Sequence, residues 1–399
     1  MQRHLRHIRL PATTVLIFLA IEFLDELVDG VGSAAWPLVR NDLDLTYIHI
    51  GLLLSVPGIF STFIEPIIGI LGDVGYRRLL VVGGGVAFAA AVGLVSVSQG
   101  FVILLIAWII FFPSSGAFVS LSQASLMDYD PKRREQNMAR WVFAGSIANV
   151  LGPLALTAAI AIGIGWRGAF MAIAVLAIPA IMASYRLPFG AVERGPDREA
   201  QSFREGIRNA VRALKRFEVV RWLTLLQASD LMLDIFKSFL ALYMVDIAGV
   251  SESRAALTIA VWVGVGLIGD LLLIPLLERM RGLTYLRYSV VVVLLLYPAF
   301  LLAPSFEIKL VIAGLLGFAN AGWYSILQGQ AYSSLPGRSG TVVALGNVFG
   351  IVAWVVPLGL GVVSATWGLD TAMWLLLAGP VVLLIGLVES GMRGGNPLP

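Results

Sequence analysis

The sequence predicts an all-α polytopic membrane protein whose twelve transmembrane helices form two pseudo-symmetric six-helix bundles. Three observations predict this fold class. Hydrophobic residues make up 58% of the chain and charged residues only 13%, far from the balance of a soluble globular domain. The apolar residues gather in runs of about 20 or more, the length that a helix needs to cross the hydrocarbon of a bilayer. Acidic residues also stand at matching positions in the two halves of the chain, separated by a constant offset.

Twelve apolar runs follow one another, separated by polar segments. In order they cover residues 13–39, 46–71, 79–98, 102–126, 138–163, 167–187, 219–246, 252–277, 284–304, 308–333, 338–365 and 369–390. The first run is too long for the apolar core of a signal peptide and carries acids in place of a small-residue cleavage site. We therefore expect it to remain in the mature protein.

The Lys and Arg residues predict the orientation of these helices. They concentrate in alternate connecting segments; Lys237 lies within a span, and the few on the other side are Arg40, Arg167, Arg254 and Lys309. The positive-inside rule then places both termini in the cytoplasm. We expect the protein to lie in the cytoplasmic (inner) membrane. The basic pI of about 9.2 reflects this topology and indicates no nucleic-acid partner.

One long polar segment, residues 188–218, predicts the domain organisation. It separates an N-terminal six-helix bundle, residues 1–187, from a C-terminal six-helix bundle, residues 219–399. Its second part carries apolar residues at helical spacing, namely Phe203, Ile207, Val211, Leu214 and Phe217. With basic residues on the other faces, this pattern predicts an amphipathic linker helix on an anionic membrane surface.

The halves are predicted to be copies of one another, because an offset of 205 residues aligns their first two helices without gaps. The offset places Asp25 on Asp230, Asp29 on Asp234, Glu65 on Asp270, Asp73 on Glu278, and Pro131 and Arg133 on Pro336 and Arg338. Internal repeats of this kind are typical of secondary transporters.

This organisation resembles the major facilitator superfamily over nearly the whole chain. The stretch "GILGDVGYRR" is similar to the family's loop signature G-x-x-x-D-R-x-G-R-R/K, which it matches at Gly69, Asp73, Arg77 and Arg78. Val74 replaces an arginine of that signature, and Gly75 stands one place early. The resemblance implies a cytoplasmic gate in which the acid meets helix-end dipoles. The C-terminal counterpart, "LLERMRG", contains Glu278 and Arg279.

Within the family, the motifs are closest to the drug and small-molecule exporter branch. The stretch "ANVLGPLALT" is similar to an exporter motif, which it matches at Gly152 and Pro153, and "GWRGAF" also resembles this branch. Small residues let helices approach closely, and proline bends them. Phe112 stands where proton-coupled exporters usually have an arginine, so the role of that arginine does not carry over.

Two predicted helices carry stripes of ionisable residues. Helical geometry places the members of each set on one face: Glu22, Asp25, Glu26 and Asp29 in the first span, and Gln227, Asp230, Asp234 and Lys237 in the seventh. Charge inside a membrane is expensive and usually faces a bundle interior or a water-filled path. The resemblance implies that both helices line a central cavity, where the stripes would lie opposite each other.

Carboxyl groups in such a place can exchange a proton near neutral pH or hold a cation that competes with it, which is what an antiporter requires. Structural roles compete with this hypothesis: Lys237 would neutralise Asp234 three residues away, and Glu22 would be hydrated near the cytoplasm. For Glu65 and Asp270 we expect a gate or a stabilised kink.

Aromatic residues within the spans have two interpretations. Trp108, Trp141, Trp262, Trp323 and Trp354 could stack on an aromatic or cationic ligand, although packing is the commoner role. Trp36, Trp166 and Trp367 are expected to be anchors at the membrane interface.

Several function classes find no support in the sequence. There is no cysteine, histidine occurs only at positions 4, 7 and 49, and no phosphate-binding glycine loop is visible. We therefore expect no enzyme activity and no cofactor, and an ion gradient or the substrate's own gradient as the energy source.

The leading hypothesis is a secondary active transporter that works by alternating access, with proton-coupled efflux of a cationic or amphipathic organic compound. A divalent metal transporter is an alternative, because carboxylates are ligands of hard cations, although Lys237 argues against a dedicated metal cage. Proton-coupled uptake of a small metabolite is another. Expected partners are a small-molecule substrate, protons or another coupling cation, and the lipid bilayer, with the monomer as the working unit.

Overall fold

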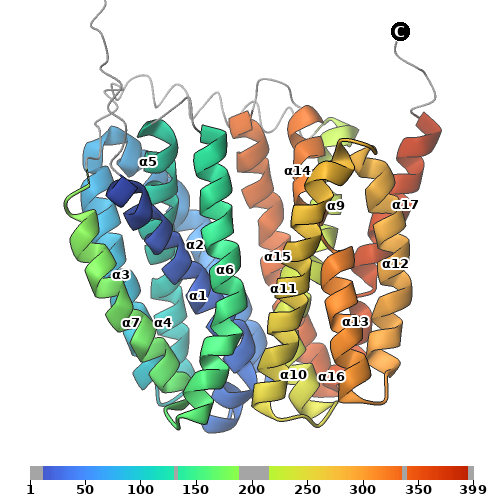
Figure 1. Ribbon diagram of the computed structural model, residues 1–399, viewed down its shortest axis with the longest axis horizontal. Helices are drawn as coiled ribbons and strands as arrows, with labels where there is room; N and C mark the ends of the chain where they lie inside the picture. The colour runs from blue at the N-terminus through green and yellow to red at the C-terminus, as the bar shows by residue number, and fades with distance from the viewer. Residues whose placement is uncertain (1–11, 130–133, 188–214, 335–338, 394–399) are drawn as a thin grey trace, which may run out of the picture.

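The computed structural model describes residues 12–129, 134–187, 215–334 and 339–393. Each predicted span corresponds to one helix or to two consecutive helices (Figure 1). The N-terminal helices are α1 (Ala12–Asp42), α2 (Tyr47–Leu71), α3 (Arg77–Val97), α4 (Phe101–Ser115), α5 (Leu121–Tyr129), α6 (Arg134–Ala161) and α7 (Gly165–Ser184). The C-terminal helices are α9 (Phe217–Asp230), α10 (Phe236–Asp246), α11 (Glu252–Leu277), α12 (Gly282–Leu302), α13 (Phe306–Ala319), α14 (Trp323–Ser334), α15 (Ser339–Trp367), α16 (Leu369–Leu375) and α17 (Ala378–Arg393).

Ten helical segments of the described chain are long and apolar enough to cross a membrane. α1 and the continuous helix from α9 to α10 are not among these ten, although α1 alone has 31 residues. These two helices carry the predicted ionisable stripes. Their low apolarity follows from those charges, which only a protein interior or an aqueous cavity can accommodate at membrane depth.

The segment η1 (Gly72–Tyr76) joins α2 to α3 through a kink at Gly75, whose φ is 112°. Two π-helical turns interrupt helices of the described chain, η2 (Gly116–Ser120) and η4 (Leu231–Ile235). The sequence did not indicate them, because a π turn differs from an α turn by a single residue and leaves the apolar composition unchanged. The tenth span is also broken, at residues 320–322, where Gly322 has a φ of 71°.

The helices form two groups, α1 to α7 and α9 to α17, that stand side by side in Figure 1. The groups meet where α2 packs on α15, α6 on α11, and α1 on α10. α1 begins and α17 ends at the same end of the helices (Figure 1). We call the opposite end distal. The predicted linker helix as far as residue 214 and the repeat residues Pro131, Arg133, Pro336 and Arg338 lie outside the described residues. Phe217, the last apolar residue of the predicted linker helix, begins α9.

Close backbone approach holds the groups together near the distal end. A Cβ atom added at Gly51 of α2 would lie 2.8 Å from the Pro357 carbonyl oxygen of α15. The hydroxyl of Ser55 accepts a hydrogen bond from the Leu358 amide at 3.0 Å. Inside the N-terminal group, a Cβ at Gly152 of α6 would lie 2.6 Å from the Gly30 carbonyl carbon of α1. The small size of Gly152 therefore allows α6 to contact α1 directly.

Three side chains join the two groups at the distal end, and we call them the distal cluster: Arg40 of α1, Tyr47 of α2 and Asp246 of α10. The Arg40 guanidinium contacts both Asp246 carboxylate oxygens, one of them at 2.7 Å. The Tyr47 hydroxyl donates to Asp246 Oδ2 at 2.6 Å. Only 17% of the Arg40 side chain and 13% of the Asp246 side chain are exposed. This bidentate ion pair ties the two groups together away from water.

Candidate functional site

A central cavity of about 630 Å³ lies between the two groups of helices. Both ionisable stripes reach it. The charged side chains that line it are Asp25, Glu26, Asp29, Glu65, Asp230, Asp234 and Lys237. The structure therefore places six acids and one cation around one space, drawn from both halves of the chain.

The η4 turn shapes the C-terminal side of this cavity. α9 ends at Asp230, η4 contains Asp234, and Lys237 lies in the first turn of α10. All three line the cavity together with Gln227. π-helical turns change the rotation of the helix that follows them and occur frequently at functional sites.

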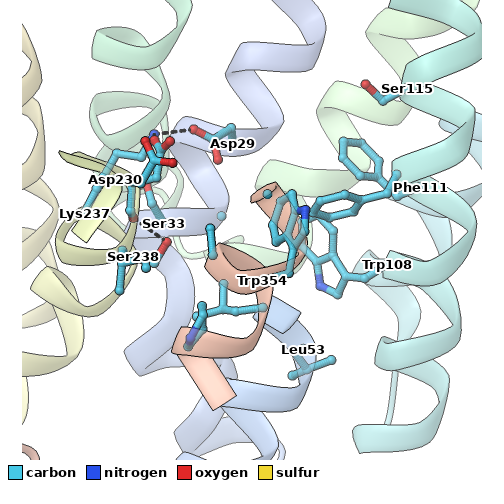
Figure 2. A pocket seen from close by; sticks show the side chains of 18 of the residues that line it. Asp29, Ser33, Leu53, Trp108, Phe111, Ser115, Asp230, Lys237, Ser238 and Trp354 are labelled. Atoms are coloured by element: carbon cyan, nitrogen blue, oxygen red, sulfur yellow. Dashed lines mark hydrogen bonds and ion pairs between the residues drawn. The ribbon is translucent and has the colours of Figure 1, made fainter. Parts of the chain in front are cut away.

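Lys237 and Asp29 form an ion pair across the two groups, which we call the central ion pair. The Lys237 ammonium nitrogen lies 2.7 Å from Asp29 Oδ2 and 3.6 Å from Asp234 Oδ1 (Figure 2). The sequence suggested Asp234 as its partner, but the shorter contact is with Asp29. The Lys237 side chain is 11% exposed, whereas that of Asp29 is 53% exposed. A ligand in the cavity can thus reach the acid without displacing the lysine stem.

The other acids of α1 differ in their surroundings. Glu26 lines the cavity and accepts a hydrogen bond from the Asn149 amide of α6. Asp25 also lines the cavity, and its Oδ1 is buried without a hydrogen-bond partner among the described residues. Glu22 is buried and does not line the cavity. It packs closely against α6 instead, where a Cβ at Gly145 would lie 2.8 Å from its Oε1. The predicted stripe is therefore divided between the cavity and the α1–α6 contact.

Aromatic rings form the wall opposite the central ion pair, as Figure 2 shows for Trp108, Phe111 and Trp354. The rings that line the cavity are Trp36, Trp108, Phe111, Phe112 and Trp354. The Phe112 and Trp354 rings meet across the two groups, with centroids 5.6 Å apart. Phe112, in the place of the family's usual arginine, thus contributes an apolar contact.

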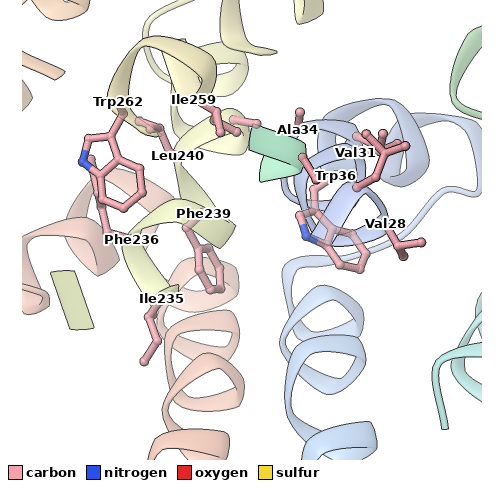
Figure 3. Close-up of a cluster of buried hydrophobic side chains, with 14 of the residues drawn as sticks. Val28, Val31, Ala34, Trp36, Ile235, Phe236, Phe239, Leu240, Ile259 and Trp262 are labelled. Atoms are coloured by element: carbon pink, nitrogen blue, oxygen red, sulfur yellow. The ribbon is translucent and has the colours of Figure 1, made fainter. Parts of the chain in front are cut away.

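The expectation that Trp36 anchors the protein at the membrane interface is wrong. Its side chain is buried in the apolar cluster of Figure 3 and lines the cavity, with its ring centroid 6.3 Å from that of Trp108. The position of Trp36 near the end of the first predicted span favoured an anchor at the membrane interface. The rotation of α1 about its axis instead turns this side chain inward.

Glu65 and Asp270 occupy the same place in the sequence repeat but have different surroundings. Glu65 lines the central cavity and accepts a hydrogen bond from the Ser61 hydroxyl at 2.7 Å. Asp270 lies outside that cavity and accepts from the Gly322 amide at 2.8 Å, at the break between α13 and α14. The repeat therefore places one acid in the cavity and the other at a helix break.

The residues of the loop signature lie at the end where α1 begins. The side chain of Asp73 lies outside the described residues. Arg77 is buried. The Arg78 guanidinium donates a hydrogen bond to the Tyr185 carbonyl, and its Cζ lies 5.1 Å from the centroid of the Tyr185 ring. Glu278 and Arg279 are exposed just after α11. Pro153 continues α6 beyond the tight contact of Gly152.

Within the described residues, no three His, Cys, Asp or Glu side chains are grouped so that they could hold a metal ion. The acids of the cavity are instead distributed along its walls, with Lys237 among them.

Known proteins are similar to this chain over most of its length. The family model described as Major Facilitator Superfamily matches residues 18–358. No curated protein matches the sequence. Among solved structures, a bacterial homolog of the human lysosomal transporter Spinster, in an inward-facing and occupied conformation, is similar with a TM-score of 0.74 and 16% identity, over 96% of each chain. The nucleoside transporter NupG has a TM-score of 0.71 and 13% identity, over 94% of this chain and 98% of its own.

Proposed function

This chain belongs to the Major Facilitator Superfamily and is a multi-pass membrane transporter, and we propose that it exports a cationic or amphipathic organic compound in exchange for protons. The observation that carries the proposal is the central cavity, where carboxylates from both halves face a wall of aromatic rings.

The charge of the cavity wall supports a cationic substrate. Among the described residues, six acids and one lysine line it, so the local field favours a positive ligand over a negative one. The aromatic wall supports an organic cation in particular, because ring faces attract cations and apolar groups alike. A volume of about 630 Å³ is within the range of small-molecule sites.

Competition between the substrate cation and protons for the same carboxylates would couple substrate transport to proton movement. A cation that enters the cavity neutralises acids that otherwise hold protons, and protonation in turn releases the cation. Asp29 is suited to this exchange, because its partner Lys237 belongs to the other half and the acid is open to the cavity. Loss of the central ion pair would also remove one contact between the halves.

The distal cluster supports alternating access. It closes the end opposite the start of α1. If both termini are cytoplasmic, as the distribution of basic residues indicates, this conformation is closed to the outside. The bacterial Spinster homolog of similar fold is also described in an inward-facing conformation. Export then requires the distal cluster to separate while the other end closes.

Reconstitution in liposomes tests the proposal. Proton movement is followed with a pH-sensitive dye while organic cations, divalent metals and small neutral metabolites are added in turn. We expect an organic cation to evoke proton movement that is lost in Asp25→Asn and Asp230→Asn. Glu307→Gln, an exposed acid in the first turn of α13, is the matched control and should behave as wild type.

Other outcomes would replace the proposal. Unchanged transport in both aspartate variants would make the stripes structural. A response to metals alone, or to neutral metabolites alone, would favour the corresponding alternative transporter.

A further inference from the structure

A second, smaller cavity lies beside the central one, between α6 and α11, and we call it the side chamber. Its volume is about 180 Å³. Its polar lining residues are Ser146, Asn149, Lys237, Trp262, Asp270 and Asn320. Asn149 and Lys237 also line the central cavity, so these two residues separate the side chamber from it.

The lining of the side chamber carries polar atoms that have no hydrogen-bond partner among the described residues. They are Trp262 Nε1, Asn320 Oδ1 and Asn149 Oδ1. Trp262 is only 8% exposed and Asn320 only 4%. An indole nitrogen can only donate and an amide oxygen can only accept. A ligand that satisfies both must donate and accept, and water does so in a space of this size.

Asp270 holds the other end of the side chamber. Its Oδ1 accepts from the Gly322 amide at 2.8 Å, which fixes the carboxyl at the helix break. The groups that face the chamber from the elements packed around α11 are Ser146 and Asn149 of α6, Lys237 of α10 and Asn320 after α13. The Tyr285 hydroxyl of α12 lies beside it and donates to the Ala321 carbonyl at 3.1 Å.

We propose that the side chamber is a water-filled path that carries the coupling proton between Asp270 and the central ion pair, separate from the cavity of the substrate. The inference rests on the proposed proton coupling. It gives Asp270 a role in proton transfer besides its hydrogen bond at the helix break.

The proton transfer balances without a further reactant. In this conformation, closed at the distal end, the path releases the proton that Asp29 has carried inward. The Lys237 ammonium group passes one proton to chamber water, and that water passes one along the chain to the Asp270 carboxylate. The Lys237 nitrogen regains a proton from the protonated Asp29 Oδ2, which lies 2.7 Å away. Asp270 then loses its proton to solvent. Asp29 becomes charged, Lys237 keeps its charge, and the central ion pair forms again.

Single cysteines test the hydration of the chamber, and the natural chain has none to remove. Leu267→Cys places a thiol in the chamber wall. Ile268→Cys, the next residue, lies on the outer face of α11 with 54% exposure and is the control. Because the hydrated thiolate is the nucleophile that attacks a thiol reagent, we expect Leu267→Cys in liposomes to react at least about tenfold faster than Ile268→Cys with a small water-soluble reagent. Equal, slow reaction of both would overturn the proposal.

Asp270→Asn tests the proton path. Asparagine still accepts the hydrogen bond from Gly322 but cannot carry a proton. We expect substrate-evoked proton movement to fall several-fold, while exchange of labelled for unlabelled substrate at equal pH stays near the wild-type rate. Trp262→Phe, which keeps a ring and removes the indole N–H, should lower proton movement in the same direction.

Failure of this inference differs from failure of the proposed function. If Asp270→Asn moves protons like wild type, the side chamber is not the path, and proton-coupled export stands. If the wild-type protein moves substrate without moving protons, the proposed coupling fails and the inference fails with it.

Discussion

The central ion pair and the distal cluster connect the same two helices, α1 and α10, yet they are built differently. In the distal cluster, Arg40 and Asp246 are both largely shielded from water, and Tyr47 donates a further hydrogen bond. In the central ion pair, a buried Lys237 meets an acid that is 53% exposed. A shielded bidentate arginine pair holds a fixed geometry, whereas a lysine is a point charge that tolerates exchange of partners. We therefore expect the distal cluster to hold that end closed and the central ion pair to exchange partners with a ligand.

Removal of the central cation should have the largest effect. Lys237→Met leaves Asp29, Asp234 and Glu26 facing one another without a counter-charge. We expect substrate-evoked proton movement to fall by at least about tenfold, because truncating one partner of a buried, hydrogen-bonded charge pair costs about 2 kcal/mol or more. The measurement is dye-detected proton flux in liposomes. Recovery of substrate exchange in the double variant Asp29→Asn/Lys237→Met would show that the loss came from unbalanced charge, whereas wild-type flux in Lys237→Met would contradict the assignment.

Weakening the distal cluster should have a moderate effect on conformation. Asp246→Asn breaks the bidentate pair and lowers the stability of the closed distal end, so the population opened there should rise by about fivefold. A cysteine at Leu54, which lines the central cavity, reports this opening through labelling from the distal side. Unchanged labelling would mean that the α2–α15 backbone contacts alone hold this end closed.

The contact of two aromatic rings across the halves, between Phe112 and Trp354, should affect substrate binding to a smaller degree. Trp354→Ala removes a ring from the cavity wall, and the affinity for an organic cation should fall about fivefold, the magnitude of a partly exposed cation–π contact. Trp354→Phe should retain most of the affinity. Calorimetric titration gives the dissociation constants, and equal affinity in all three proteins would exclude the ring from the site.

The surface pair between Arg167 and Asp42 should have no effect, although Asp42 lies only two residues from Arg40. The two groups are 2.7 Å apart, but both are well exposed to solvent, where ion pairs contribute little. Asp42→Asn should therefore leave thermal unfolding and Leu54→Cys labelling unchanged. A response as large as that of Asp246→Asn would show that loss of charge at this end, and not the shielded pair, controls closure.

The distribution of the acids over the two halves could be predicted because it depends on local rules. Helical periodicity places Asp25 with Asp29, and Asp230 with Asp234, whatever surrounds them. The cost of charge in a membrane then points these faces toward an aqueous interior. Both pairs do line the central cavity, and the expected spans agree with the observed helices.

Partner choice could not be predicted in this way. Lys237 has Asp234 within its own helix, yet its shorter contact is with Asp29 of the other half. Glu22 belongs to the same sequence stripe as Asp25 but packs against α6. Trp36 had the position of an anchor and lines the cavity. Each of these outcomes depends on how far a helix is rotated about its axis, which packing against its neighbours decides.

The sequence by itself therefore determined the spans and the acidic faces, because these follow from composition and periodicity along one chain segment. The repeat followed from comparing the two halves of the chain, and the family from the resemblance of short motifs around Asp73 and Gly152. Tertiary structure alone decided the central ion pair, the distal cluster and the side chamber. Each joins residues from helices far apart in the chain, such as Arg40 and Asp246, or Asn149 and Asn320. Their meeting depends on helix rotation, crossing and local π turns, and a shift of one residue in any of these would change the partners.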